Sequence, residues 1–312
     1  MSLRTVIFLL TIGVAAFCVR AQAQTTYTST TVADAFLATG SPDNPVGTDL
    51  TNDNFGGAGI LAISPASADK GQFQSVLEFN FADAVALFNS AYGSNNWAVT
   101  GITLTLASNY GVAGVQPKNK IFNVVSAGNF VIKWLSDTNW VEGTGNPGMI
   151  TVDGVAFGDL PELLSDPCDI LCTNTYTPPG NNIPVTYTLP LDTNLVTEVV
   201  SGVNATLLFY AADNQIGYLF NSHEFGGSNV PLINVTATLF MEILSSNFTN
   251  GVFSLTALGS PNSQYQIQAN SDLTTSNWQT LGTVTADANG NIQFTDTTAT
   301  NQQRFYRLSE SF

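Results

Sequence analysis

The sequence contains few positive charges. Eight lysines and arginines stand against 23 aspartates and glutamates, so the formal net charge at pH 7 is −15. This excess of negative charge repels the phosphate backbone of nucleic acids and argues against nucleic-acid binding. No arginine occurs between Arg20 and Arg304. The intervening chain therefore lacks the residue with which polysaccharide lyases commonly neutralise a substrate carboxylate.

Histidine occurs once, as His223. A His-dependent nucleophilic triad or a His-rich metal centre would have to use this residue. No G-x-S-x-G elbow is present, and the neighbouring Ser222 would point to the opposite face of a strand. The remaining interpretations of His223 are a contributor to a ligand surface and a structural hydrogen-bonding group.

Long apolar runs are also scarce. The one at the N-terminus, from Val6 to Val19, follows the positive charge of Arg4 and precedes a small-x-small cleavage pattern at Ala21-Gln22-Ala23. It is shorter than the roughly 20 residues of a membrane span. We interpret residues 1–23 as a signal peptide and expect a secreted or cell-surface protein that begins near Gln24 and does not span the membrane.

Only three cysteines are present. Cys18 lies in the expected signal peptide, and a lipoprotein would use it as the lipidated residue, but Phe17 stands where a small residue is expected. Cys168 and Cys172 remain, and in an oxidising compartment we expect them to form a local disulfide that pins one loop. A redox or metal pair is the alternative, although C-x-x-x-C lacks the usual thioredoxin spacing.

The remaining composition, rich in Thr, Val, Asn and Gly, favours antiparallel β-structure with few helices. Between Val99 and Ala107, the apolar residues Ile102, Leu104 and Leu106 alternate with threonines, as in a strand with one face in a core. No fixed-period repeat is visible, so a jelly-roll-like antiparallel β-sandwich is favoured over a propeller. The predicted strands are Ser75–Phe81, Val99–Ala107, Lys120–Val125, Val185–Leu191, Thr206–Ala211 and Leu232–Phe240, and the predicted short helices are Ala82–Phe88 and Asn194–Val200.

A domain boundary is expected near residue 243. We predict a first domain at 24–242, a polar linker at 243–251, and a small immunoglobulin- or fibronectin-like β-sandwich at 252–312. The second domain shows short strand patterns at turn-separated intervals of about ten residues, and Asp287-Ala288-Asn289-Gly290 has the composition of a hairpin connection.

Three polar-aromatic motifs recur in order along the first domain: Asn54-Phe55-Gly56-Gly57, Trp140-Val141-Glu142-Gly143 and Phe220-Asn221-Ser222-His223-Glu224. Together they resemble the DNRLRE domain, a bacterial β-sandwich related to the family 96 carbohydrate-binding modules, over roughly Thr31–Phe240. The resemblance implies a jelly-roll fold and carbohydrate binding. Two arginines typical of that family are absent: His223 replaces one, and the strand that carries the other has only Gln74 and Glu78 as its long polar residues.

The C-terminal segment resembles a small module found at the ends of many secreted bacterial proteins. The resemblance rests on Tyr265-Gln266-Ile267-Gln268-Ala269, Asn277-Trp278-Gln279-Thr280-Leu281 and Arg304-Phe305-Tyr306-Arg307-Leu308. It implies a role in surface display, spacing or attachment and no chemistry of its own.

Sugar binding needs exposed aromatic faces and polar planar groups. We predict a ligand surface that includes Tyr92, Trp97, Tyr110 and His223, because Tyr92 and Trp97 flank a turn-rich segment. Trp134 and Trp140 could supply rings as well, or could equally close the core of the sandwich.

Carboxylates offer two further chemistries. Glu142 and Glu224 are the candidates for a glycosidase pair, whereas in a structural interpretation they accept hydrogen bonds from loop amides. Calcium is favoured over zinc because hard oxygen ligands abound, and we place a candidate calcium site at Asp43, Asp49 and Asp53.

The sequence thus predicts a secreted, non-catalytic carbohydrate-binding or cell-surface-associated protein, with a polysaccharide as the partner. The first alternative is a structural subunit that assembles at the cell surface or in an extracellular matrix. A glycan-degrading enzyme that uses Glu142 or Glu224 is the second alternative.

Overall fold

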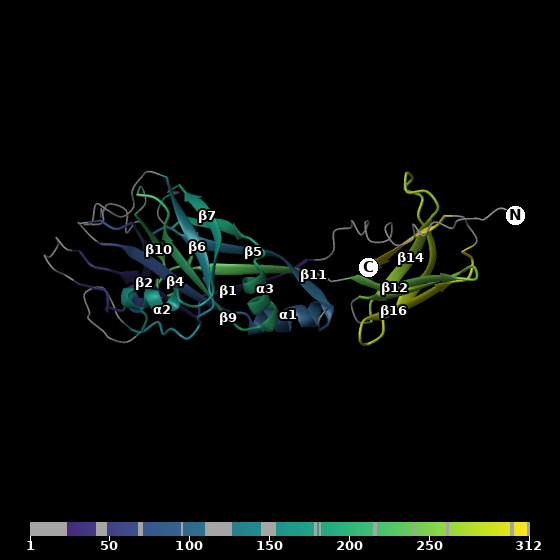
Figure 1. The fold of residues 1–312 in the computed structure, drawn as a ribbon, viewed down its shortest axis with the longest axis horizontal. Helices are drawn as coiled ribbons and strands as arrows, with labels where there is room; N and C mark the ends of the chain where they lie inside the picture. Colours follow the sequence, from purple (N-terminus) through teal and green to yellow (C-terminus); the bar gives the residue numbers. More distant parts are fainter. Residues whose placement is uncertain are drawn as a thin grey trace. The chain divides into compact units, whose positions relative to one another are not determined.

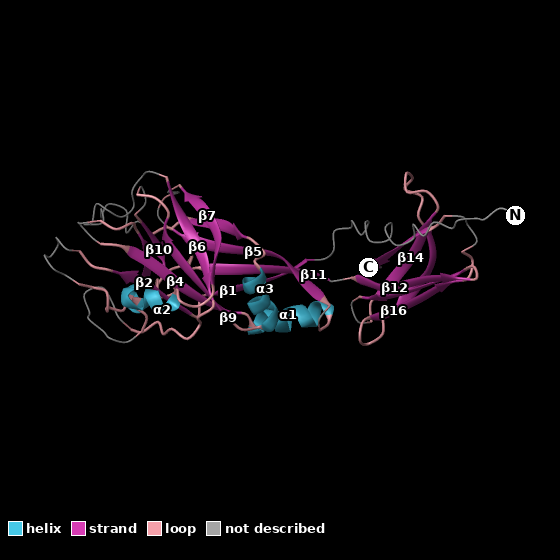
Figure 2. Ribbon diagram, in the orientation of Figure 1, coloured by secondary structure: helices cyan, strands magenta, loops and turns pink. Residues whose placement is uncertain are grey.

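The computed structural model describes residues 24–41, 49–67, 71–94, 96–109, 127–144, 154–177, 180, 182–214, 217–239, 241–259, 262–299 and 303–310. Strands dominate this part of the chain, and helices are few and short (Figure 2). Two compact units are distinguished. The larger comprises Thr26–Ala86 and Val99–Thr236, and the smaller comprises Ala237–Phe312, Leu87–Ala98 and the first 25 residues.

The predicted signal peptide at residues 1–23 lies outside the described residues. Among the helices that are described, none has the length and apolar character needed to cross a membrane.

Three antiparallel sheets make up the strands of the larger unit (Figure 1). The first has the order β1 (Gln24–Thr30), β11 (Leu232–Leu239), β5 (Trp97–Ala107) and β8 (Pro184–Leu189). The second has the order β2 (Ala33–Ala38), β4 (Phe73–Asn80), β9 (Asn204–Ala211), β6 (Gly128–Leu135) and β7 (Cys168–Tyr176). The third pairs β10 (Tyr218–Asn221) with β3 (Ile60–Ile63).

The strand pairings are nested, which is the mark of a jelly roll. Strand β6 pairs with β7, β5 with β8, β4 with β9, and β1 with β11, so the chain runs out and returns alongside itself. Aromatic contacts join the sheets across the core: the ring of Phe130 on β6 lies 5.2 Å from Tyr187 on β8 and 6.2 Å from Phe220 on β10. This confirms the predicted jelly-roll-like sandwich.

Local sequence patterns explain the confirmed elements. Ile102, Leu104 and Leu106 of β5 are all buried, as their alternation with threonine predicts. Helix α3 (Thr193–Ser201) begins where the Asp192 carboxylate accepts hydrogen bonds from two free backbone amides. The other helices are α1 (Ala82–Tyr92), α2 (Leu160–Leu163) and the 3-10 helices η1 (Gly56–Ala58) and η2 (Phe157–Asp159).

The smaller unit is a sandwich of two three-stranded sheets, as far as its residues are described. One has the order β12 (Glu242–Thr249), β13 (Val252–Leu258) and β16 (Asn291–Asp296), and the other β15 (Gln279–Thr285), β14 (Gln264–Asn270) and β17 (Phe305–Glu310). Phe253 and Tyr306 stack between them with ring centroids 3.7 Å apart. This arrangement of first, second and fifth strands against third, fourth and sixth is fibronectin-like.

Two predictions about connections were wrong. The expected linker at 243–251 is mostly strand β12, which pairs with β13, and exposed and half-buried residues alternate from Ser245 to Thr249 as in an edge strand. The turn at residues 287–290 uses Gly290 at a φ of 82°. It joins strands of different sheets, however, and is not a hairpin. The strand predicted at Lys120–Val125 lies outside the described residues.

The predicted disulfide was also wrong, because both Cys168 and Cys172 are free thiols. They lie on strand β7 and not in a loop. Four residues of extended chain separate their Cα atoms by about 13 Å, whereas a disulfide requires roughly 4.4–6.8 Å. The proline before Cys168 suggested a loop, but the segment from Cys168 to Tyr176 pairs with β6 and therefore has the extended conformation of a strand.

Candidate functional site

The three motifs that resemble the DNRLRE domain meet at one place in the larger unit. Asn54 of the first motif donates a hydrogen bond to the backbone carbonyl of Glu142 in the second. Ser222 of the third motif donates its backbone N–H to the carbonyl of Gly59, which follows the first motif, at 3.4 Å. Residues separated by up to about 170 positions in the sequence therefore surround a common point.

Buried aromatic rings anchor two of these motifs. Phe55 stacks on Phe36 of strand β2 with ring centroids 4.3 Å apart, and both rings are buried. Phe220 is buried against Phe130 and Tyr176. The motif aromatics hold the loops onto the sandwich, and the polar residues beside them are placed accordingly.

The backbone at Gly56 and Gly154 lies unusually close to Glu142. A Cβ atom added to Gly56 would lie 2.5 Å from both the Cγ atom and the carbonyl oxygen of Glu142. Gly154 has a φ of +89°, and a Cβ there would lie 2.7 Å from the carbonyl oxygens of Glu142 and Val141. Only glycine fits at these two positions without a shift of the backbone, so the chain fixes where the Glu142 side chain begins.

Glu142 forms a cluster with two other carboxylates, those of Asp34 on β2 and Glu224 after β10. One oxygen from each lies within 4.8 Å of the others. Asp34 is fully buried: its Oδ2 accepts hydrogen bonds from the Thr31 hydroxyl at 2.9 Å and from the His223 backbone N–H at 2.8 Å. Its Oδ1 is buried and has no hydrogen-bond partner.

Burial and mutual repulsion shift the protonation of this carboxylate cluster. Burial raises the pKa of Asp34 to about 7, and the nearby charge of Glu224 adds to the shift. Burial also raises the pKa of Glu142 well above its ordinary value, with further contributions from Glu224 and Asp34. Three carboxylates this close oppose one another's ionisation, so the cluster favours a bound proton or a bound cation.

His223 lies at the edge of the carboxylate cluster. Its Nδ1 is 3.4 Å from Oε1 of Glu224, and its side chain is 45% exposed. The Ser222 hydroxyl donates to Oε2 of the same Glu224 at 3.2 Å. The predicted role of His223 at a ligand surface stays a prediction, although the side chain is accessible and near ionisable groups.

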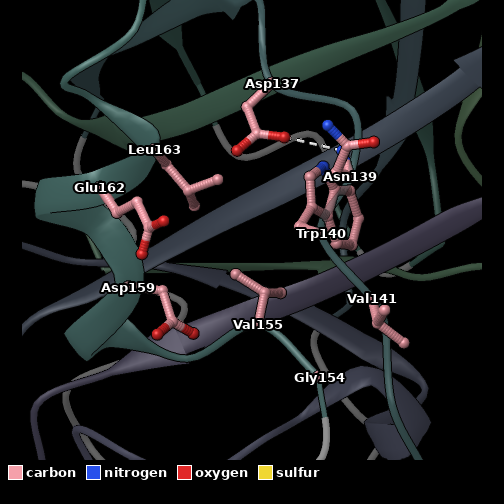
Figure 3. A pocket seen from close by; sticks show the side chains of 9 residues that line it. All are labelled: Asp137, Asn139, Trp140, Val141, Gly154, Val155, Asp159, Glu162 and Leu163. Atoms are coloured by element: carbon pink, nitrogen blue, oxygen red, sulfur yellow. Dashed lines mark hydrogen bonds between the residues drawn. The ribbon is translucent and has the colours of Figure 1, made fainter.

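A pocket of about 350 Å³ opens beside Trp140 (Figure 3). Figure 3 shows the carboxylates of Asp159 and Glu162 on one side, Trp140 and Asn139 on the other, and Val155 between them. The indole Nε1 of Trp140 donates to the Thr206 hydroxyl at 3.0 Å, which fixes the orientation of the ring. The pocket is lined by Asp137, Asn139, Trp140, Val141, Gly154, Val155, Asp159, Glu162 and Leu163.

Short-range hydrogen bonds position the polar residues of this pocket. The Asp137 carboxylate accepts from the backbone N–H of Asn139 at 2.7 Å, and the Asp159 carboxylate accepts from that of Ala156 at 2.8 Å. The backbone N–H of Val155 donates to the carbonyl of Val141 at 2.6 Å. The segment that carries Trp140 and Glu142 is thus tied to the segment that begins α2.

The predicted aromatic ligand residues lie elsewhere. Tyr92 was expected to be exposed, and this was wrong: it ends helix α1, it is buried, and its hydroxyl bonds to Thr25 and to the carbonyl of Ala237. Trp97 is half-buried, with its ring 4.9 Å from Phe88 and its Nε1 bonded to Asn89. Tyr110 lies outside the described residues.

The predicted calcium residues do not form the acidic group that the structure assembles. Asp43 lies outside the described residues. The Asp49 carboxylate accepts two hydrogen bonds from Thr51, which lower its pKa, and so serves an ordinary turn. Asp53 is buried, which raises its pKa. In the described part of the chain, Asp34, Glu142 and Glu224 are the acidic residues close enough to share one ion.

Comparisons with known proteins do not assign the chain to a family. No family model matches the chain, and no curated protein matches it. Among solved structures it is similar to a β-glucuronidase of Lactobacillus rhamnosus (9% identity, TM-score 0.23, 94% of this chain and 45% of that chain). A β-glucuronidase of Ruminococcus gnavus shows 6% identity and a TM-score of 0.21 over 89% of this chain and 40% of that chain. A β-D-glucuronidase of Dictyoglomus thermophilum shows 6% identity and a TM-score of 0.22 over 94% and 44%.

The chain spans less than half the length of these structures. Similarity at this level does not indicate a function for the chain.

Proposed function

We propose that this is an exported, non-catalytic glycan-binding protein and that its binding site is the pocket beside Trp140. The observation that carries the proposal is the pairing, in one pocket, of an oriented indole ring with hydrogen-bonding side chains. A cavity of about 350 Å³ is within the usual range for small ligands. Sugars use both an aromatic face and polar planar groups, and the pocket offers Trp140 and Asn139 for these roles.

The charge of the pocket points to the class of glycan. Asp137, Asp159 and Glu162 contribute three carboxylates, and none of the described lining residues is lysine or arginine. A uronate would be repelled by this lining, whereas neutral hydroxyls and the ammonium group of an amino sugar are attracted by it. We therefore propose a neutral or amino-sugar glycan and not an acidic polysaccharide.

The proposal of binding without catalysis is supported by where the carboxylates with raised pKa values lie. Two of the three pocket carboxylates already accept hydrogen bonds from backbone N–H groups. The carboxylates with strongly raised pKa values, Asp34, Glu142 and Glu198, are absent from the described lining of the pocket, although Glu142 directly follows the lining residue Val141. A glycan in the pocket would meet two anchored acceptors, the carboxylates of Asp137 and Asp159.

A glycan array and a polysaccharide pull-down with the chain from Gln24 onward test the proposal. Trp140→Phe keeps an apolar ring and Trp140→Ala removes it, and the alanine variant is expected to bind about tenfold more weakly, the effect of losing one aromatic contact of roughly 1.4 kcal/mol. The matched control is Trp278→Ala in the smaller unit, where Arg307 covers the indole ring at 4.3 Å.

Several results would overturn the proposal. Unchanged binding by Trp140→Ala together with loss in Trp278→Ala would move the site to the smaller unit. Release of reducing sugar from a retained glycan would make the protein an enzyme. No retention on any glycan, with ordered filaments by electron microscopy, would favour a structural subunit.

A further inference from the structure

We propose that Asp34, Glu142 and Glu224 form a binding site for one hard divalent cation of the calcium class. The inference does not rest on glycan binding, because it follows from the geometry of the carboxylate cluster and can be tested without a glycan.

The spacing of the three carboxylates suits a calcium ion. Two oxygens bound to the same calcium at about 2.4 Å lie at most about 4.8 Å apart. In this cluster one oxygen from each side chain lies within 4.8 Å of the others. The three side chains can therefore reach a common ion with little rearrangement.

The state of Asp34 is a second and independent indication of a ligand. The whole side chain is buried, and its Oδ2 already accepts hydrogen bonds from Thr31 and from the His223 backbone. Its Oδ1 is buried without a partner. A buried carboxylate oxygen with no donor is unfavourable, and a cation shared with Glu142 and Glu224, whose carboxylate lies against that of Asp34, would supply the missing partner.

Within the described residues, side chains do not supply a matching positive charge. No arginine occurs between Arg20 and Arg304, and Lys133, the one lysine within the described residues, lies with its Nζ against the Cys168 sulfur at 3.4 Å. His223 approaches only Glu224, through Nδ1, and is charged only when protonated. The cluster thus presents more negative charge than its described neighbours can balance.

The ligand type selects the kind of metal. All three groups are carboxylates, which calcium prefers, whereas zinc and copper favour imidazole and thiolate. Glu224 is partly exposed, with 31% of its side chain accessible, so the site can be reached from solvent. The glycine contacts of Gly56 and Gly154 hold Glu142 in position before any ion arrives.

Isothermal titration calorimetry with calcium on the EDTA-treated chain from Gln24 onward tests this site. One ion per chain is expected, with a dissociation constant at or below about 1 mM, as for extracellular calcium sites. At a calcium concentration 100 times the dissociation constant, the larger unit should unfold about 5–10 °C higher. Asp34→Asn and Glu142→Gln should each abolish this shift, and the exposed Asp83→Asn should keep it.

A variant that simply failed to fold would be recognised by its behaviour without calcium. Glu142→Gln removes one of three opposing charges, so without calcium it should unfold at the same temperature as the unaltered protein or higher. If about 10 mM calcium, magnesium or manganese gave no heat of binding and no change in the unfolding temperature, the proposal would be overturned. The three carboxyl groups would then be a cluster that shares protons. A calcium shift that persists in the Asp34→Asn, Glu142→Gln double variant would overturn the proposal too, by placing the ion elsewhere.

Discussion

Replacing Gly154 with alanine should destabilise the larger unit by an amount that can be worked from the structure. The residue has a φ of +89°, and an added Cβ would lie 2.7 Å from the carbonyl oxygens of both Val141 and Glu142, with the Asn54 amide also in the way. The left-handed conformation costs roughly 1–2 kcal/mol for a residue with a side chain. Displacing two backbone carbonyls adds about 1–3 kcal/mol, as overpacking does elsewhere. The expected loss is therefore about 2–5 kcal/mol.

Gly59 provides the matched control within the same unit. Its φ is +70°, but a Cβ there would meet nothing closer than the Glu224 carbonyl oxygen at 3.7 Å, an ordinary contact. Gly59→Ala should consequently cost only the conformational part, about 1–2 kcal/mol. The difference between the two variants isolates the close approach of Gly154 to the segment that carries Glu142.

Urea denaturation followed by tryptophan fluorescence measures this difference. Because the chain has two units that can unfold separately, Trp97 and Trp278 are first replaced by phenylalanine, which leaves Trp134 and Trp140 as reporters of the larger unit. With an unchanged slope, the midpoint for Gly154→Ala should fall well below that for Gly59→Ala. Equal midpoints would refute the claim that Gly154 is required by close packing against Glu142.

Two further outcomes are expected. Burial raises the pKa of the Glu198 carboxyl to about 7, although the Trp134 indole donates a hydrogen bond to it. The folded protein therefore keeps a proton on Glu198 that the unfolded chain releases near pH 4.5. Because the folded state binds more protons, the free energy of unfolding falls as pH rises from about 4.5 to 7. Glu198→Gln should flatten that part of a pH series of denaturation curves by about 1–2 kcal/mol after allowance for partial exposure; an unchanged slope would contradict it. Thiol titration of the unfolded, unreduced chain from Gln24 should count two thiols, Cys168 and Cys172, and a count of zero would restore the disulfide.

Strands and helices whose formation depends on residues close together in the sequence could be predicted. The strand from Val99 to Ala107 was recognisable because apolar and polar residues alternate within a few positions. Helix α3 was recognisable because Asp192 stands directly before it as a cap. Such signals depend only on local geometry, so the fold class and the positions of β4, β5, β8, β9 and β11 followed from them.

Predictions that depended on the environment of a residue were less successful. Tyr92 lies beyond the predicted helix Ala82–Phe88 and beside a turn-rich segment, which suggested exposure, but it ends helix α1 and contacts with residues far away in the sequence bury it. Residues 243–251 were predicted to be a linker because an exposed edge strand has much the same polar composition. Cys168 and Cys172 are close in sequence but far apart in an extended strand. In each case the deciding partner lies on another segment.

The carboxylate cluster itself could not be found from spacing, because its members are brought together by the nested pairing of strands. Glu142 and Glu224 were recognised as candidates, but nothing in the sequence showed that they meet. Asp34 was overlooked, although one signal was available: it is the only charged residue of strand β2, between Ala33 and Ala35 in an otherwise apolar run. A charged residue in such a position is rarely buried without a partner.

The three motifs are architectural in part, but architecture does not explain the ionisable side chain at position 142. Asn54, Gly56 and Gly154 all contact backbone atoms of this residue, and they would contact a glutamine in the same way. Two full charges 4.8 Å apart repel by roughly 3 kcal/mol at an effective dielectric constant of 20. Three such pairs approach the whole stability of a typical domain, about 5–15 kcal/mol. The fully ionised cluster is therefore compatible with a folded chain when a cation balances its charge, and without a cation the carboxyl groups have to hold protons instead. A set of turns imposes no such requirement.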